Sequence, residues 1–190
     1  MIAALETLRE RLPEPARDLK LNLQAVLEPS SGAILSEAQR WGVAVASAIA
    51  ARHPALRDAV LAEAAQHAPR AVLEDAQAAA ALMAMNNIFY RFRHIIEKAV
   101  YEDKPARLRM NRLVKPAASK VDFELYCLAV SAIHNCVACV KSHEKAVLEG
   151  GLSEDHVFEA IRIAAVINGA ALGLELGELP DEAEASASKS

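Results

Sequence analysis

The chain has 190 residues, a net charge of −4 at pH 7 and a pI of about 5.9, and 53% of its residues are hydrophobic. This length fits one domain, or two small halves that share a core. The weakly negative charge argues against a nucleic-acid-binding protein, which would present a basic surface. We expect neither a secretory signal peptide nor a membrane span, because no uncharged apolar run reaches the ~18–20 residues that a span needs. We therefore expect a cytoplasmic protein without membrane contact.

Helix signals dominate the chain. Alanine makes up roughly a fifth of the residues, and glycine, which disfavours helices, occurs only 7 times. Ser36, followed three residues later by Gln39, forms a capping-box pattern for a helix over about 37–52. Pro54 suits the first turn of the next helix.

Four further helices follow in the second part of the chain. Gly150 and Gly151 end one of them, and Ser153 begins the next. No alternating strand pattern with hairpin chemistry appears, so we predict an all-α, multi-helix bundle. We expect a single helical domain over 1–175 and a disordered tail over 176–190. The four helices are predicted over about 72–96, 122–133, 136–149 and 154–172.

The two halves of the chain resemble each other weakly. The sequence ASAI at 46–49 matches VSAI at 130–133, and each is followed later by a helix that begins with Glu-Asp. Both an internal duplication and a chance likeness of Ala-rich helices fit this pattern. Aligned on the SAI match, Arg52, Ala55 and Ala59 take the places of Cys136, Cys139 and His143.

The segment HNCVACVKSH, residues 134–143, holds two of the three cysteines and two of the six histidines. With Asn135 as the N-cap, both cysteines would lie in the first turns of a helix. At about 100° per residue, Cys136, Cys139 and His143 fall within a wedge of about 60°. A helix N-terminus favours the thiolate, and His143 could exchange a proton with Cys139. An ordinary, partly exposed histidine fits the spacing equally well.

A turn at 134–135 would fold the flanking helices into an antiparallel pair. Glu124 and His143 would then lie at about 16 Å and 13 Å from that turn along their helices, so their side chains could meet. Glu124, Cys127 and Ser131 share one stripe of the first helix. The geometry therefore allows a Glu–His–Cys proton relay. It equally allows a Glu124 side chain that is simply solvated.

The Cys-x2-Cys pattern is also a zinc half-site, but a structural zinc site needs four ligands. The others would have to come from His143, His134 or Cys127. We expect no bound metal, and structural zinc remains the alternative. Cys127 is expected to be a small buried apolar residue, or else a third thiol near the site. A close cysteine pair in a reducing compartment is more often catalytic or metal-binding than a structural disulfide.

Glu124, the run Cys136-Val-Ala-Cys139 and His143, with SAI before them and EDHVFEAIRIAAVING after, resemble the AhpD family. These are alkylhydroperoxidases of the carboxymuconolactone decarboxylase superfamily. The sequence ALMAMNNIFYRFRH at 81–94 resembles the central helix of that family. The resemblance covers nearly all of the chain up to about residue 175. It implies an all-helical subunit that assembles as a homotrimer.

The resemblance also implies an antioxidant thiol peroxidase that reduces organic hydroperoxides. Cys139 would match the thiol that is oxidised to sulfenic acid, although the helix dipole alone favours Cys136 as the more acidic thiol. Cys136 would match the proton donor that then forms the disulfide. Glu124 and His143 would match the proton relay. Ala138 stands where well-studied family members carry a histidine.

The family further implies an electron donor and a protein partner, with no bound cofactor. The donor would be a dihydrolipoyl group on a 2-oxoacid dehydrogenase component, and the partner would be the peroxiredoxin AhpC. Two other functions stay open. One is a decarboxylase or lyase like the lactone-processing members of the superfamily, against which the cysteine pair argues, and the other is a helical scaffold with structural zinc.

Overall fold

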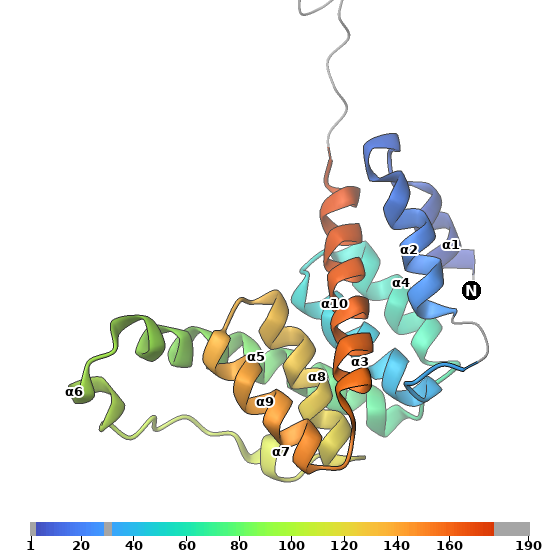
Figure 1. The fold of residues 1–190 in the computed structure, drawn as a ribbon. Helices are drawn as coiled ribbons and strands as arrows, with labels where there is room; N and C mark the ends of the chain where they lie inside the picture. The colour runs from blue at the N-terminus through green and yellow to red at the C-terminus, as the bar shows by residue number, and fades with distance from the viewer. Residues whose placement is uncertain (1–2, 29–31, 177–190) are drawn as a thin grey trace, which may run out of the picture.

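The computed structural model describes residues 3–28 and 32–176 (Figure 1). Within these ranges all regular structure is helical, which confirms the predicted all-α fold. The helices are α1 (Ala3–Glu10), the 3₁₀ helix η1 (Glu14–Ala16), α2 (Arg17–Leu27), α3 (Glu37–Ala50), α4 (Pro54–Ala64), α5 (Arg70–Ile96), α6 (Ala99–Glu102), α7 (Asn111–Val114), α8 (Lys120–Ile133), α9 (Val137–Glu149) and α10 (Glu154–Leu174).

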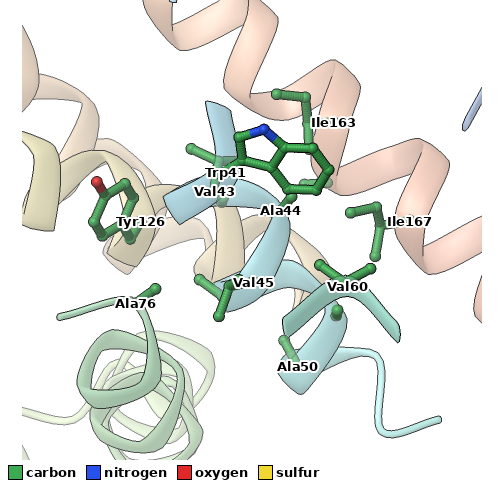
Figure 2. Packing of buried hydrophobic residues seen from close by; sticks show 14 of the residues in the cluster. Trp41, Val43, Ala44, Val45, Ala50, Val60, Ala76, Tyr126, Ile163 and Ile167 are labelled. Atoms are coloured by element: carbon green, nitrogen blue, oxygen red, sulfur yellow. The ribbon is translucent and has the colours of Figure 1, made fainter. Parts of the chain in front are cut away.

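Helix α3 forms the centre of the core. Its residues 41–48 are all buried, and α4, α5, α8 and α10 pack around it. Figure 2 shows Trp41 of α3 beside Ile163 and Ile167 of α10. Gly42 permits the close approach of α8, because a Cβ there would lie 2.3 Å from the ring of Tyr126. The small residues of α3 therefore let helices α5, α8 and α10 pack closely around one apolar core.

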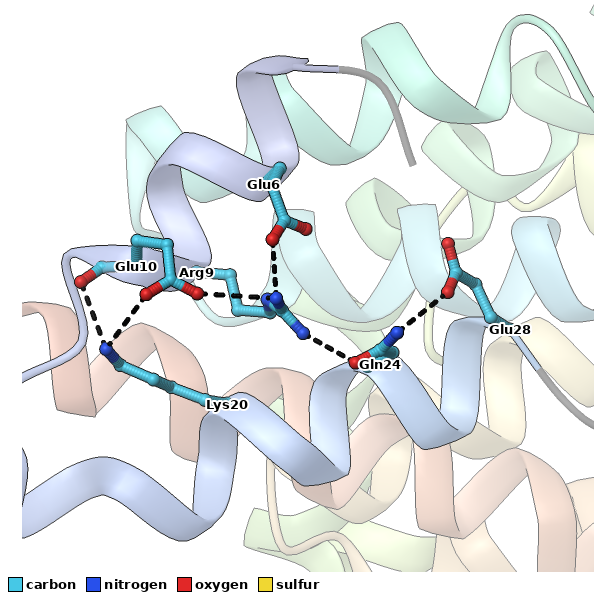
Figure 3. A network of polar contacts seen from close by, with 6 residues as sticks. All are labelled: Glu6, Arg9, Glu10, Lys20, Gln24 and Glu28. Atoms are coloured by element: carbon cyan, nitrogen blue, oxygen red, sulfur yellow. Dashed lines mark hydrogen bonds and ion pairs between the residues drawn. The ribbon is translucent and has the colours of Figure 1, made fainter.

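The N-terminal helices cover this core from one side, with α2 against α10 and α1 against α4. Arg9 links α1 to α2 at their surface (Figure 3). Its guanidinium donates to Glu6 Oε1 at 2.5 Å and to Gln24 Oε1 at 2.7 Å. Such contacts near the surface typically stabilise a protein by less than about 1 kcal/mol. Packing of the apolar helix faces therefore holds these helices in place.

The predicted helix boundaries follow local capping chemistry. The backbone N–H of Gln39 donates to Ser36 Oγ at 3.2 Å, and that of Ser36 donates to Gln39 Oε1 at 2.9 Å, which confirms the capping box. Pro54 begins α4, and Ser153 is the N-cap of α10. Gly151 has a φ of +96°, a conformation that glycine adopts without steric cost.

The predicted N-cap of α9 was wrong by one residue. Cys136 is the N-cap, and Asn135 before it has a left-handed φ of 59°. Asparagine tolerates this conformation better than most residues do. One left-handed residue lets the chain leave α8 and start α9 antiparallel to it within a three-residue connection, so the helix begins later than expected.

The α3–α4 and α8–α9 pairs have the same backbone plan. Helices α3 and α8 each have 14 residues, and each ends two residues before a left-handed residue, Arg52 (φ 62°) or Asn135. The next residue, His53 or Cys136, is the N-cap of the following helix. The register predicted from the SAI match was therefore one residue off. The counterparts of Cys136, Cys139 and His143 are His53, Leu56 and Val60, not Arg52, Ala55 and Ala59.

Helix α10 is long and apolar enough, by length and composition alone, to cross a membrane. In the structure it packs against α2, α3 and α8. Its residues Ile163, Ala164, Ile167 and Ala170 are buried in the common core. Part of the apolar surface of α10 is thus buried within the fold, while Phe158 and Leu172 stay exposed.

The segment between α5 and α8 leaves the body of the protein. The α6 region projects away from the other helices (Figure 1), and α6 and α7 contain no buried residue. Large apolar side chains stay exposed along the C-terminal half of α5 and on α6. They are Ile88, Phe92, Ile95, Ile96, Val100 and Tyr101. We call this the α5–α6 apolar surface.

The predicted disordered tail falls almost entirely on 177–190, outside the described residues, and the domain limits stay a prediction.

Candidate active site

The cysteine pair lies where α8 gives way to α9. A disulfide joins Cys136 to Cys139, with their Cα atoms 5.2 Å apart. Cys136 is the N-cap and Cys139 the third residue of α9, so both sulfurs lie at the positive end of the helix dipole. Cys136 is fully buried, whereas 6% of Cys139 is exposed. Cys139 is therefore the sulfur that a molecule from solvent can reach.

The predicted meeting of Glu124 and His143 is confirmed. The antiparallel packing of α8 and α9 brings Glu124 Oε2 to 2.6 Å from Nδ1 of His143. The ammonium of Lys120 donates to the other carboxylate oxygen. Both Glu124 and His143 are more than 90% buried. The sequence alternative of a solvated Glu124 is thereby excluded.

The pKa of Glu124 lies below its ordinary value, and two opposing effects decide this. Burial is the largest single influence and raises it. Hydrogen bonds from His143 and Lys120, together with their positive charges, lower it and prevail. The carboxylate is therefore ionised at neutral pH and can hold a proton on the Nδ1 atom of His143.

The other ring nitrogen of His143 faces a methionine. Nε2 lies 3.2 Å from Sδ of Met83 on α5. A thioether sulfur accepts but cannot donate, so this contact is a hydrogen bond only when Nε2 carries a proton. No direct hydrogen bond between His143 and Cys139 occurs in the described part of the chain. In the disulfide form the predicted relay is thus assembled as far as His143, and Met83 is a neighbour that the sequence pattern did not reveal.

A pocket of about 250 Å³ opens onto Cys139 and His143. Its walls combine apolar side chains with a few polar groups, which suits a small organic molecule. Asn86 of α5 donates to Met110 Sδ at 3.2 Å and so ties together two parts of the wall. The lining residues are Asn86, Tyr90, Met110, Leu113, Ala138, Cys139, Ser142 and His143.

A buried carboxylate holds the segment that closes this pocket. Asp75 accepts from the backbone N–H groups of Ala117 and Ala118, each at 2.8 Å, and from Arg112 Nε at 3.1 Å. Met110 and Leu113, which line the pocket, lie just before or within α7. The anchoring of residues 112–118 to α5 therefore fixes the outer wall of the site.

Helix α5 also holds the turn that carries Cys136. Ser131 Oγ donates to Asn87 Oδ1 at 3.0 Å, so the amide nitrogen of Asn87 is left to donate to Nδ1 of His134 at 3.2 Å. Arg91 Nη1 donates to the carbonyl of His134 at 2.7 Å. Ser131, the last residue of the predicted stripe, therefore contacts α5 and stabilises the turn, whereas Glu124 of the same stripe faces His143 of α9. Asn87 and Arg91 belong to the 81–94 run, which resembles the central helix of the AhpD family and was expected near the buried surface of a trimer.

Cys127 is fully buried in the core, which confirms the prediction of a small apolar residue. Burial, and after it the negative charge of Glu124, raises the pKa of its thiol well above the ordinary value. Cys127 therefore stays protonated. No group of three His, Cys, Asp or Glu residues in the described ranges is arranged to hold a metal ion.

Known proteins resemble this chain along most of its length. A family model described as the carboxymuconolactone decarboxylase family matches residues 101–174. A protein named alkyl hydroperoxide reductase AhpD from Anaeromyxobacter dehalogenans is 66% identical over 92% of this chain and 92% of its own length. The chain belongs to the AhpD family. A relative of the same name from Solibacter usitatus is 52% identical, over 90% of this chain and 96% of its own.

Membership of the AhpD family confirms the resemblance drawn from the sequence. The match to the family model contains Glu124, both cysteines of the disulfide and His143. It begins after α5, which supplies Met83 and Asn87 to the same site. The longer matches to whole AhpD relatives include that helix as well.

Proposed function

We propose that this chain is an alkyl hydroperoxide reductase that works through the Cys136–Cys139 pair. One observation carries the proposal, namely that Cys139 opens into a pocket of small-molecule size beside the buried Glu124–His143 pair. AhpD relatives that cover about nine-tenths of the chain have this activity in their names.

The reaction starts from the reduced pair. The Cys139 thiolate attacks the terminal oxygen of the hydroperoxide, the O–O bond breaks, and Cys139 becomes a sulfenic acid while the alkoxide takes up a proton and leaves as an alcohol. Cys136 then attacks the Cys139 sulfur, and water leaves as the disulfide forms. In sum, one hydroperoxide and two thiols give one alcohol, one water and one disulfide.

Cys139 is the sulfur assigned to attack because Cys136 has no exposed surface. The helix dipole does not distinguish the two strongly, since both lie within the first turn of α9. Cys136 is assigned the proton that reaches the alkoxide, and the Glu124–His143 pair is assigned the relay that moves protons to and from the two cysteines. Ala138 lines the pocket without adding an ionisable group.

We further propose that a dihydrolipoyl group returns the enzyme to its dithiol form. Its two thiols would reduce the disulfide by two successive exchange steps, with no cofactor resident in the protein. The pocket beside Cys139 would admit the first of these thiols. A lipoyl-bearing 2-oxoacid dehydrogenase component would supply the group, the peroxiredoxin AhpC would be a further acceptor of electrons, and all would meet in the cytoplasm.

The α5–α6 apolar surface supports the proposal of a homotrimer. Ile95 is 69% exposed and Ile88 63%, whereas ordinary monomers rarely expose a large contiguous apolar patch. Light scattering of the purified chain should give three times the mass of one chain. Replacing Phe92 on this surface with Asp should lower that mass, and a monomer in the unmodified chain would contradict the proposal.

A thiol titration tests the proposed chemistry. The reduced protein should lose two thiols when it receives one equivalent of an alkyl hydroperoxide, while Cys127 stays a free thiol. Metal analysis on the same sample separates this outcome from a zinc scaffold, in which stoichiometric zinc would protect the cysteines. A protein whose thiol count is unchanged by peroxide would refute the reductase proposal.

A further inference from the structure

A second hollow, of about 360 Å³, lies beside the turn that carries Cys136. It borders α5 through Asn87 and Arg91, whereas the Cys139 pocket borders it through the adjacent residues Asn86 and Tyr90. The two hollows therefore flank one stretch of α5. The lining of this second hollow is Arg52, Ala84, Asn87, Ile88, Arg91, Ile133, His134 and Asn135, and we call it the arginine hollow.

Three basic side chains from different parts of the fold meet in the arginine hollow. Arg52 follows α3, Arg91 belongs to α5, and His134 follows α8. No Asp or Glu is among the described residues that line it. Two of these side chains, Arg52 and Arg91, are guanidinium groups that stay positively charged at neutral pH, on a chain whose net charge is −4.

These positive charges are not neutralised by neighbouring carboxylates. The guanidinium of Arg52 makes no hydrogen bond or ion pair with any described residue, and only its backbone N–H is used, donating to the carbonyl of Ile49 at 3.2 Å. Arg91 donates to the carbonyl of His134, which carries no charge. Burial and then the charge of Arg52 lower the pKa of His134, and Arg91 acts in the same direction, while the backbone carbonyls of Ala50 and Met83 oppose the shift.

The backbone conformation of Arg52 also supports a role for this residue in the hollow. Its φ of 62° lies in the left-handed region, where glycine or asparagine is at ease and arginine is not. The equivalent residue of the second half is Asn135, which also lines the hollow. Residues held in such conformations by the surrounding structure cluster at functional sites. The strained turn here presents a guanidinium to the hollow.

We propose that the arginine hollow binds a carboxylate, and that this carboxylate belongs to the hydroperoxide substrate. A guanidinium matches a carboxylate with two parallel hydrogen bonds, and Arg52 is free to provide them. Asn135 and Arg91 lie beside it in the same lining. The substrate part rests on the proposed reductase function, whereas carboxylate binding does not.

Acetate binding tests the hollow without reference to activity. We expect acetate, added to the oxidised full chain at constant ionic strength, to shift the NMR signals of the His134 ring saturably and to raise the pKa of His134. The reason is that a bound anion offsets the charges of Arg52 and Arg91. Arg52→Gln should weaken acetate binding by about tenfold or more, the effect of one lost hydrogen bond to a charged group.

Arg57→Gln is the matched control for this binding. It removes the same charge from α4, but Arg57 pairs with Asp58 at 2.8 Å and lies outside the hollow. This variant should bind acetate as the unmodified chain does. An acetate response that does not saturate, that survives in Arg52→Gln, or that chloride reproduces in full would overturn the carboxylate site.

Turnover then tests whether the carboxylate is that of the substrate. A fatty-acid hydroperoxide and its methyl ester differ only in this group, and kcat/KM should favour the acid by about tenfold. Arg52→Gln should abolish the preference for the acid, whereas the control Arg57→Gln should retain it. Equal rates for acid and ester in the unmodified chain would refute the substrate assignment. If neither is consumed, the reductase proposal fails, and the acetate measurement still decides whether the hollow binds a carboxylate.

Discussion

The two helical pairs of this protein share a backbone plan and differ in almost all of their chemistry. At the third position of the second helix, α4 has Leu56 and α9 has Cys139. At the seventh position the residues are Val60 and His143. At the fifth position of the first helix, α3 has Trp41 where α8 has Glu124.

The N-caps show the difference most directly. In the first half, Nδ1 of His53 accepts a hydrogen bond from the backbone N–H of Leu56 at 3.1 Å. In the second half, Cys136 bonds covalently to the side chain of Cys139. The same left-handed turn thus serves an apolar core in one half and a redox pair in the other. The turn itself is a structural device, and the side chains placed on it decide whether it does chemistry.

Removing the cysteines should have the largest effect, because it makes the second turn as inert as the first. Cys136→Ser and Cys139→Ser should each abolish peroxide turnover coupled to dihydrolipoyl groups. Cys127→Ser is the control, since its buried thiol takes no part in the cycle. Turnover that persists unchanged in both active-site variants would show that the pair is not the redox centre.

The relay residues should have the next largest effect. Glu124→Gln and His143→Ala should each slow turnover by roughly 10²-fold, within the range for lost acid–base help. The double variant should be hardly slower than either single one, because the two side chains act as one unit. Steady-state kinetics of the three variants measure this, and fully additive losses would mean that the residues act separately.

In the first half, Leu56 is the counterpart of Cys139, and its replacement should affect stability and not activity. Leu56 is fully buried, so Leu56→Ala should lower the free energy of unfolding by roughly 2–5 kcal/mol. Activity per folded molecule should stay unchanged at a temperature where the variant is folded. Denaturant unfolding and an activity assay on the same sample test both expectations. A loss of activity without a loss of stability would reveal a chemical role for the first half.

The smallest expected effect is on the pH dependence of stability. The pKa of Glu124 is lower in the folded state than its ordinary value of 4.5, so its ionised form contributes stability above that pH. This contribution should be lost as the pH falls through the folded-state pKa. The free energies of unfolding of the unmodified chain and of Glu124→Gln should therefore differ by a constant amount near neutral pH. The two values should converge in acid, as denaturant unfolding at each pH would show. A difference that grows toward low pH would contradict this assignment.

Much of the site could be predicted because its residues are close in the sequence. Cys136, Cys139 and His143 lie on one helix, where a period of 3.6 residues places them on one side. Glu124 could be added because a short turn forces α8 and α9 to run antiparallel. Met83, by contrast, is 60 residues from His143, and no local pattern connects them.

The sequence by itself determined the all-helical fold, the starts of α3, α4 and α10, and the group of reactive side chains on α8 and α9. These features depend on propensity, capping and helical spacing, which act within a few residues. Tertiary structure decided the N-cap at Cys136, the wall of the pocket that Asp75 anchors, and the meeting of Arg52, Arg91 and His134. Each of these depends on how α5 packs against α3, α8 and α9, and therefore on core contacts between residues far apart in the chain.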